Sequence, residues 1–298
     1  MTSTRFPIHA RMLVPHDLLL DGRRIAYGVH ALSTGRGAAS VVLIHGTPSS
    51  SLIWRNVAPA LVEAGYQVIA FDLLGYGASE RPHPISVDTS VSAQVPVLLG
   101  LMDFLGIDAA HLLAHDVGGA IAQRAGILHS DRVRSIALLD VCSFDSWPSD
   151  RTQQQMEAGL DALIRAPADQ HRKHFEEWLL STVVDEASMR TGPLQHYLDF
   201  ISGPVGQASF FQHQVAHYDH RHTSEISHRL NELGRIPVSV IWGAEDQWQK
   251  PHWAERIHAA IPGSSLTFIK SAGHFIMEDK PAEVSQALLE HLSRAAVG

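Results

Sequence analysis

The 298-residue sequence predicts an α/β fold, in which helices cover both faces of a mostly parallel sheet. Short β-rich runs bounded by turn residues alternate with longer segments of helical period. The alternation stops near Val141 and resumes at 237–243, and the stretch between them is amphipathic without a convincing strand. Apolar residues make up 45% of the chain and charged residues 18%, which suits a sizeable core. We therefore expect one α/β domain with a helical insertion.

Each expected element follows from local pattern and boundary residues. Strands are expected at 24–30, 40–46, 67–73, 111–116, 133–140, 237–243 and 265–270. Helices are expected at 54–65, 91–106, 117–129, 251–261 and 281–295, and amphipathic segments of the insertion at 153–166 and 174–184. The last helix begins at a proline, which suits a first turn.

Composition excludes several classes of partner. The 23 Lys and Arg against 31 Asp and Glu give a net charge of −8 without a basic cluster, so we expect no nucleic-acid partner. The single cysteine, Cys142, excludes an intrachain disulfide and is expected to be a buried structural thiol. The 20 histidines are scattered without a ligand pair such as HExxH, so we expect no metal and no cofactor.

Two segments bear on location. Residues 1–14 lack the apolar core of a secretory signal. The most apolar later stretch, 95–106, is shorter than the roughly 18 residues that a membrane span needs. We therefore expect a cytoplasmic protein without a membrane partner.

Three polar residues follow the ends of expected strands. Asp116 lies in "LLAHDVGGAIAQR", where an apolar run, one polar residue and two glycines indicate a strand, a sharp turn and a helix. Asp246 follows the strand at 237–243, and His274 follows the strand at 265–270. Because ligands bind at the carboxyl ends of the strands of open α/β sheets, these residues can converge there. Their order, nucleophile then acid then histidine, is typical of a nucleophile-elbow hydrolase.

With "HGTPSSSLIWRN", "FDLLGYGASERP", the elbow around Asp116 and "DSWP" all in place, the sequence resembles the α/β-hydrolases that use an aspartate nucleophile. These are the haloalkane dehalogenases and the epoxide hydrolases. The resemblance implies an eight-stranded, mostly parallel sheet with a helical cap inserted after strand 6. It implies a core domain at 1–140 and 230–298 and a cap at 141–229.

A carboxylate nucleophile selects the electrophile. Attack of Asp116 on a carbonyl carbon would give a mixed anhydride, whereas attack on a saturated carbon gives an alkyl ester that water can hydrolyse. His274 would act as the general base for that water, with an acid behind it. The backbone N–H groups of Thr47 and Val117 would hold the oxyanion.

The identity of the acid has two candidates. Asp246 lies in the usual loop, and Asp140 matches the position where some haloalkane dehalogenases carry their acid instead. We expect Asp246 to be the acid, because those dehalogenases lack an acid in the later loop, whereas this chain has one there.

The leaving-group residues divide the two families. Haloalkane dehalogenases resembling this chain place a tryptophan after the nucleophile and often an asparagine after the "HG", where this chain has Val117 and Thr47. A halide would therefore need a donor from the insertion, such as Trp147 or Trp178. The arginines that fluoroacetate-type relatives place beside the nucleophile are absent as well.

Epoxide hydrolases use two cap tyrosines to protonate the opened ring. Tyr218 resembles one of them in its spacing from Asp246, and the other has no evident match. Where we would seek it, the sequence has Phe175, with His174 beside it.

The sequence thus predicts a hydrolase that attacks a saturated carbon through an ester of Asp116. Dehalogenation stands slightly ahead of epoxide opening because of the similarity around "HGTPSSSLIWRN" and "DSWP". The alternatives are a binding protein that keeps the pocket and an acid–base catalyst of C–C cleavage that forms no ester. The expected substrates are water and a small, largely apolar molecule, and the sequence leaves the oligomeric state open.

Overall fold

The structure, a computed structural model, describes residues 11–32, 38–83 and 86–297. Eight strands form one sheet in the order β1-β2-β4-β3-β5-β6-β7-β8. Only β2 pairs antiparallel, with β1 and β4, and the other neighbours run parallel. The strands are β1 (His16–Leu20), β2 (Arg23–His30), β3 (Ser40–Ile44), β4 (Gln67–Phe71), β5 (Ala110–His115), β6 (Val133–Leu139), β7 (Val238–Gly243) and β8 (Ser265–Ile269). The predicted fold is confirmed.

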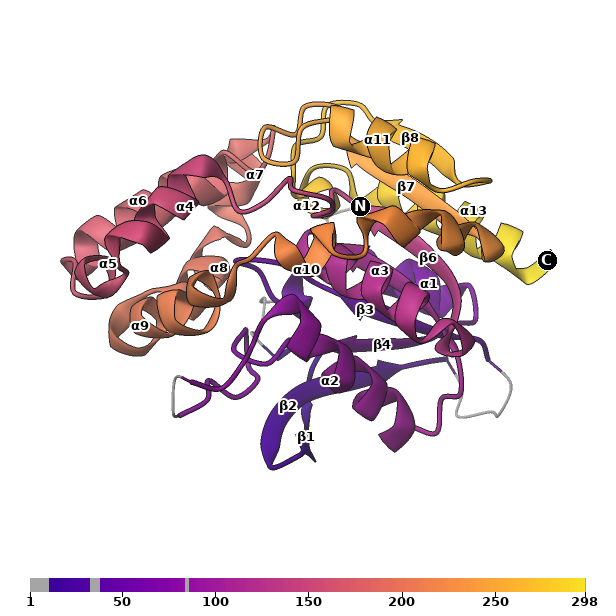
Figure 1. Ribbon diagram of the computed structural model, residues 1–298, viewed down its shortest axis with the longest axis horizontal. Coiled ribbons are helices and arrows are strands. Elements are labelled where there is room, and N and C mark those ends of the chain that lie inside the picture. The colour runs from indigo at the N-terminus through magenta and orange to yellow at the C-terminus, as the bar shows by residue number, and fades with distance from the viewer. Residues whose placement is uncertain (1–10, 33–37, 84–85, 298) are drawn as a thin grey trace, which may run out of the picture.

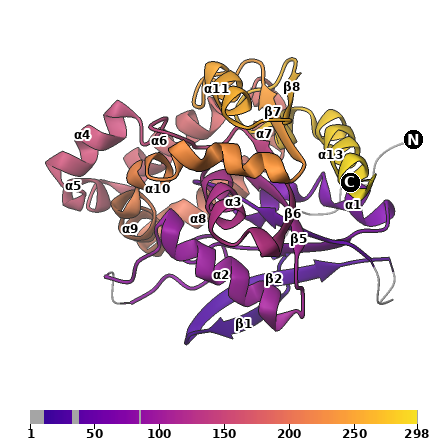
Figure 2. The same ribbon diagram turned by 45° about the vertical axis from the view of Figure 1, so that its right-hand side comes forward.

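Helices cover both faces of the sheet (Figures 1 and 2). They are α1 (Ala58–Glu63), α2 (Val91–Phe104), α3 (Val117–Leu128), α11 (His252–Ala260), α12 (Ile276–Asp279) and α13 (Pro281–Val297). Because side chains alternate along β3, Val42 and Ile44 pack in the core with α2, α3 and α11, whereas Val41 and Leu43 pack in the core with α1 and α13. The helix expected at 54–65 is shorter, because Pro59 in the first turn of α1 limits backward extension.

The insertion between β6 and β7 is helical, and all of its residues are among those that the structure describes. It contains α4 (Asp150–Ala158), α5 (Asp161–Ile164), α6 (Ala168–Leu180), α7 (Glu186–Thr191), α8 (Leu194–Ile201), α9 (Gly203–His213) and α10 (Arg221–Ser224), with 3-10 turns at Ser227–Arg235 and Val215–His217. The expected segment 153–166 is divided, because Gly159, at φ 91°, ends α4. Helices α4 to α9 lie together beyond one end of the sheet (Figure 1). The domain boundary at 141–229 stays a prediction.

Two expectations concern a secretory signal and a membrane-spanning segment. The expectation of no secretory signal rests on residues 1–14, most of which lie outside the described residues. Within the ranges that the structure describes, every helix is too short or too polar to cross a bilayer.

Candidate active site

The turn between β5 and α3 presents Asp116 at the carboxyl end of the sheet. Asp116 has φ 54° and ψ −124°, an uncommon backbone conformation for a residue with a side chain and a form of strain often found at functional sites. The turn also packs tightly, since a Cβ at Gly118 would lie 2.5 Å from the carbonyl oxygen of His45. Asp116 therefore lies in a sharp strand–turn–helix connection, as expected, and its role as a nucleophile stays a prediction.

Both oxygens of the buried Asp116 carboxylate have donors. The backbone N–H of Thr47 donates to Oδ1 at 2.7 Å, and the Val117 N–H also bonds to the carboxylate. The Cys142 thiol donates to Oδ2, with 3.4 Å between sulfur and oxygen, and Nε2 of His274 lies 3.5 Å from the same oxygen. Although burial alone would raise the pKa of Asp116, the hydrogen bond and charge of His274 outweigh it and lower that pKa. Asp116 is thus ionised at neutral pH.

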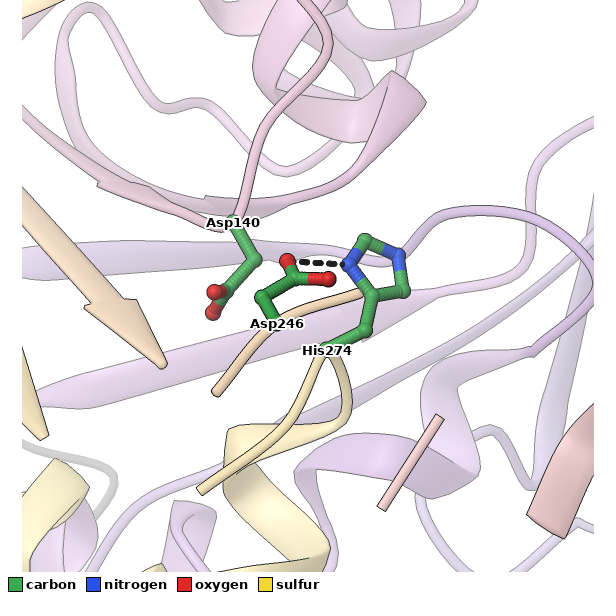
Figure 3. Close-up of side chains that lie close together, drawn as sticks. All are labelled: Asp140, Asp246 and His274. Atoms are coloured by element: carbon green, nitrogen blue, oxygen red, sulfur yellow. Dashed lines mark hydrogen bonds and ion pairs between the residues drawn. The ribbon is translucent and has the colours of Figure 1, made fainter. Parts of the chain in front are cut away.

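His274 lies between two carboxylates. Its Nδ1 is hydrogen-bonded to Asp246 (Figure 3), with 2.9 Å between Nδ1 and Oδ2. Its Nε2 faces Oδ2 of Asp116. The backbone N–H groups of Trp248 and Gln249 donate to the other oxygen of Asp246, at 2.7 and 3.0 Å. Burial disfavours the imidazolium, but the charges of Asp246 and Asp116 hold the pKa of His274 well above its usual range. The structure therefore brings the three expected residues together, although their catalytic roles stay predictions.

Asp140 lies directly after β6, close to this pair but turned away from the histidine (Figure 3). Its Oδ1 accepts the backbone N–H of Gly243 at 2.7 Å, and its buried Oδ2 has no hydrogen-bond partner. Burial and the charge of Asp246 raise the pKa of Asp140 well above its usual range, which favours its neutral form. The geometry thus favours Asp246 over Asp140 as the partner of His274.

Asp140, Asp246 and His274 also form the one group within the described residues that could hold a metal ion. Their ligand atoms lie within 4.8 Å of one another. Nδ1 of His274, however, is already hydrogen-bonded to Asp246. No step of the proposed mechanism uses a metal ion.

Replacing Asp246 and Asp140 in turn tests which of the two carboxyl groups supports His274. We expect Asp246→Asn to slow turnover by about 10²–10⁴-fold, because the amide cannot stabilise a cationic His274. Asp140→Asn is expected to change turnover little, since its carboxyl oxygen accepts the Gly243 N–H rather than contacting His274, and a carboxamide oxygen can accept the same bond. Steady-state kinetics of the two variants would check this, and the reverse order of effects would make Asp140 the functional acid.

The hydroxyl of Tyr218 is linked through Thr47 to Oδ1 of Asp116, the oxygen that accepts the Thr47 N–H. It is hydrogen-bonded to Oγ1 of Thr47, which in turn donates to Oε1 of Gln214 at 3.0 Å. Because Thr47 has a single hydroxyl hydrogen and gives it to Gln214, Tyr218 is the donor in its own contact with Thr47. Burial raises the pKa of Tyr218 well above its usual range, so the phenol keeps its proton. Tyr76, which the sequence analysis did not single out, also interacts with the Thr47 side chain.

The other residues that were candidates for binding the leaving group are less favourably placed. The indole N–H of Trp147 donates to Oγ1 of Thr223 at 3.0 Å, although its ring lies 5.7 Å from that of Tyr218. Trp178, the other expected donor, lines both the space at Asp116 and an outer chamber. Trp248, which the sequence did not mark, donates its indole N–H to Oγ of Ser181 at 3.1 Å. His174 lines an outer chamber rather than the space at Asp116. Trp147 therefore borders the site with its N–H already engaged.

Two neighbouring cavities lie beside the carboxylate and share six lining residues. The inner cavity, of about 90 Å³, is lined by Asp116, Val117, Trp147 and His274 among others. The outer chamber, of about 210 Å³, is lined mostly by residues of the insertion, with Thr47 and Trp248 from outside it. Its aromatic side chains are Phe175, Trp178, Phe210, Phe211, Tyr218 and Trp248, and both cavities share Thr47, Ser149, Thr152, Trp178, Tyr218 and Trp248. A ligand bound at Asp116 would thus extend into an aromatic chamber.

Comparison with known proteins defines the class. Residues 39–281 match the family model described as the alpha/beta hydrolase fold, so the chain belongs to that family and is a hydrolase of this fold. It is 28% identical to Epoxide hydrolase A of Mycobacterium tuberculosis, with 86% of this chain and 91% of that protein covered.

Another relative is a hydrolase of a different substrate class. A 2-hydroxy-6-oxononadienedioate/2-hydroxy-6-oxononatrienedioate hydrolase of Paraburkholderia phymatum is 26% identical, with 89% of this chain and 91% of that protein covered. Among solved structures, an alpha/beta hydrolase fold protein from Burkholderia ambifaria is 27% identical, with a TM-score of 0.80 over 93% of this chain and 97% of that chain. The family is thus established more firmly than the substrate.

Proposed function

We propose that this hydrolase opens epoxides through an alkyl ester of Asp116, with Tyr218 as the proton donor. The observation that carries the proposal is the Tyr218 hydroxyl, which is bound to Thr47, the residue whose N–H holds Asp116. An opened epoxide leaves an alkoxide, which needs a proton, whereas a halide needs only N–H donors. Sequence similarity to Epoxide hydrolase A adds support.

In the first step, Oδ2 of Asp116 attacks a ring carbon. The C–O bond of the ring breaks, and its electron pair goes to the ring oxygen. The ring oxygen replaces Oγ1 of Thr47 as the acceptor of the Tyr218 hydroxyl and takes its proton. Oδ1 stays on the N–H group of Thr47, and the N–H of Val117 stays bonded to the carboxyl group. The product of this step is a hydroxyalkyl ester of Asp116 and a tyrosinate.

In the second step, water attacks the carboxyl carbon of Asp116 and His274 takes one of its protons at Nε2. The oxyanion at Oδ1 then collapses, the ester C–O bond breaks, and the departing alkoxide takes the proton from His274. The new carboxylic acid of Asp116 releases a proton, which restores Tyr218. Esterification removes the negative charge of Asp116, one of the charges that raise the pKa of His274, and so favours the neutral base.

The outer chamber indicates the substituent. Phe175, Phe210 and Phe211 supply apolar ring surface next to Trp178. An epoxide with an aryl or alkyl group suits this lining better than one with a charged group. Styrene oxide is therefore a suitable probe.

A single turnover of styrene oxide in H₂¹⁸O tests the ester. We expect the label in the peptide that contains Asp116, because water attacks the carboxyl carbon and the diol takes an oxygen from Asp116. Mass spectrometry of the digested protein would locate it. Label in the diol alone would contradict the nucleophile and favour acid–base catalysis.

Tyr218→Phe tests the proton donor. We expect opening of styrene oxide to slow by about 10²–10⁴-fold, because general acid catalysis is lost. Alkylation of Asp116 by an alkyl bromide should change little, since bromide leaves without a proton. Rapid-quench rates for both probes would check this, with the partly buried Tyr66→Phe as the matched control. An equal loss with both probes would reject Tyr218 as the donor.

A further inference from the structure

The side-chain amide of Gln249 lies at the inner cavity with one end fixed and the other unpaired. Its Nε2 donates to the carbonyl oxygen of Ser146 at 3.4 Å and to the sulfur of Cys142 at 3.6 Å. Because a carbonyl oxygen can only accept, the amide cannot turn over without losing the bond to Ser146. Its Oε1 has no hydrogen-bond partner, although the residue is only 6% exposed.

A buried acceptor without a partner is uncommon and costs free energy unless something binds to it. Gln249 lines the inner cavity together with Asp116 and His274. An amide oxygen cannot stabilise a departing anion, so its ligand must bring an O–H or N–H group. The only such molecule that the proposed reaction requires next to His274 is water.

The contacts of Gln249 link it to Oδ2 of Asp116, the oxygen that His274 faces. Its backbone N–H donates to Asp246, the partner of His274, and its Nε2 reaches Cys142, whose thiol donates to Oδ2 of Asp116. Tyr218 reaches the opposite oxygen, through Thr47. The acceptor and Asp246, the partner of the base, thus lie in one loop after β7, and the proton donor Tyr218 lies in the insertion.

We propose that Oε1 of Gln249 accepts a hydrogen bond from the hydrolytic water, an inference that rests on the proposed ester mechanism. One proton of this water goes to Nε2 of His274 as its oxygen attacks the carboxyl carbon of Asp116. The other proton stays on the attacking oxygen and points to Gln249. With both hydrogens directed, a lone pair of the water faces the ester. Gln249 is therefore a catalytic residue of the second step only.

Gln249→Met, which keeps the length of the side chain and removes the acceptor, tests this role with styrene oxide as the probe. We expect the rate of ester formation to stay near the wild-type rate and ester hydrolysis to slow by about 10–100-fold, as misplacement of a reactant does. Rapid quench followed by intact-protein mass spectrometry would show the adduct on Asp116 accumulating. The burst amplitude counts folded active sites, so a partly unfolded variant still gives a hydrolysis rate per site.

Two further variants sharpen the test. Gln249→Leu should accumulate the same adduct, and Gln154→Met, at an exposed position of α4, should not. If Gln249→Met forms the ester more slowly, or raises KM without accumulating an adduct, the inference is wrong. If His274→Gln also forms no adduct, the ester mechanism itself is wrong and the inference falls with it.

Discussion

His274→Gln is expected to stop the reaction after the first step, with one substrate molecule bound to each protein molecule. Asp116 can still attack the epoxide, because its Oδ1 remains on the Thr47 N–H and Tyr218 still supplies the proton. Hydrolysis of the ester should slow by about 10²–10⁴-fold, since the water has lost its general base. Intact-protein mass spectrometry should show an adduct with the mass of styrene oxide.

The site of the adduct decides the interpretation. Peptide mapping should place it on Asp116, and His252→Gln, at an exposed position in α11, should turn over without an adduct. Full turnover by His274→Gln would mean that another group activates the water. His115 is the nearest alternative, with its ring 4.8 Å from that of His274, but burial lowers its pKa to about 3 and its Nε2 is bonded to the backbone oxygen of residue 274.

Strand periodicity and chain order were sufficient to place the main residues. Asp116, Asp246 and His274 each follow a parallel strand, and parallel strands end at the same edge of the sheet, so their convergence could be predicted without contacts. The choice between Asp246 and Asp140 could not be settled in this way, because both follow neighbouring strands. Only the direction of each carboxylate, toward His274 or toward the Gly243 N–H, separates them.

The directions of side chains within the insertion likewise could not be predicted from the sequence. Trp147 was expected as a halide donor, but whether its N–H meets the pocket or Thr223 depends on helices distant in the chain. Tyr218 had only its spacing to mark it. Nothing in the pattern marked Gln249 or the thiol contact of Cys142, since one is a loop amide and the other an expected core residue.

Asp116→Ala is expected to abolish epoxide hydrolysis, with a loss of about 10⁴–10⁶-fold in kcat, as removal of a nucleophile does. No ester can form without the carboxylate, so no adduct should appear even when His274→Gln is added. Steady-state diol formation and intact mass would measure both effects, with the exposed Asp108→Ala as the control. Residual turnover within about tenfold of wild type would exclude Asp116 as the nucleophile.

Asp116→Ser tests why the elbow carries a carboxylate. In the native site, Oδ1 of Asp116 already occupies the Thr47 N–H at 2.7 Å, so the carbonyl oxygen of an ester substrate has no free donor there. A serine has one oxygen fewer and would leave that N–H open, while His274 could activate its hydroxyl. We expect this variant to lose epoxide opening and to gain measurable cleavage of an activated carbonyl ester such as p-nitrophenyl acetate. The carboxylate would then select saturated carbon by filling the oxyanion hole itself, and an unchanged substrate preference in Asp116→Ser would refute that explanation.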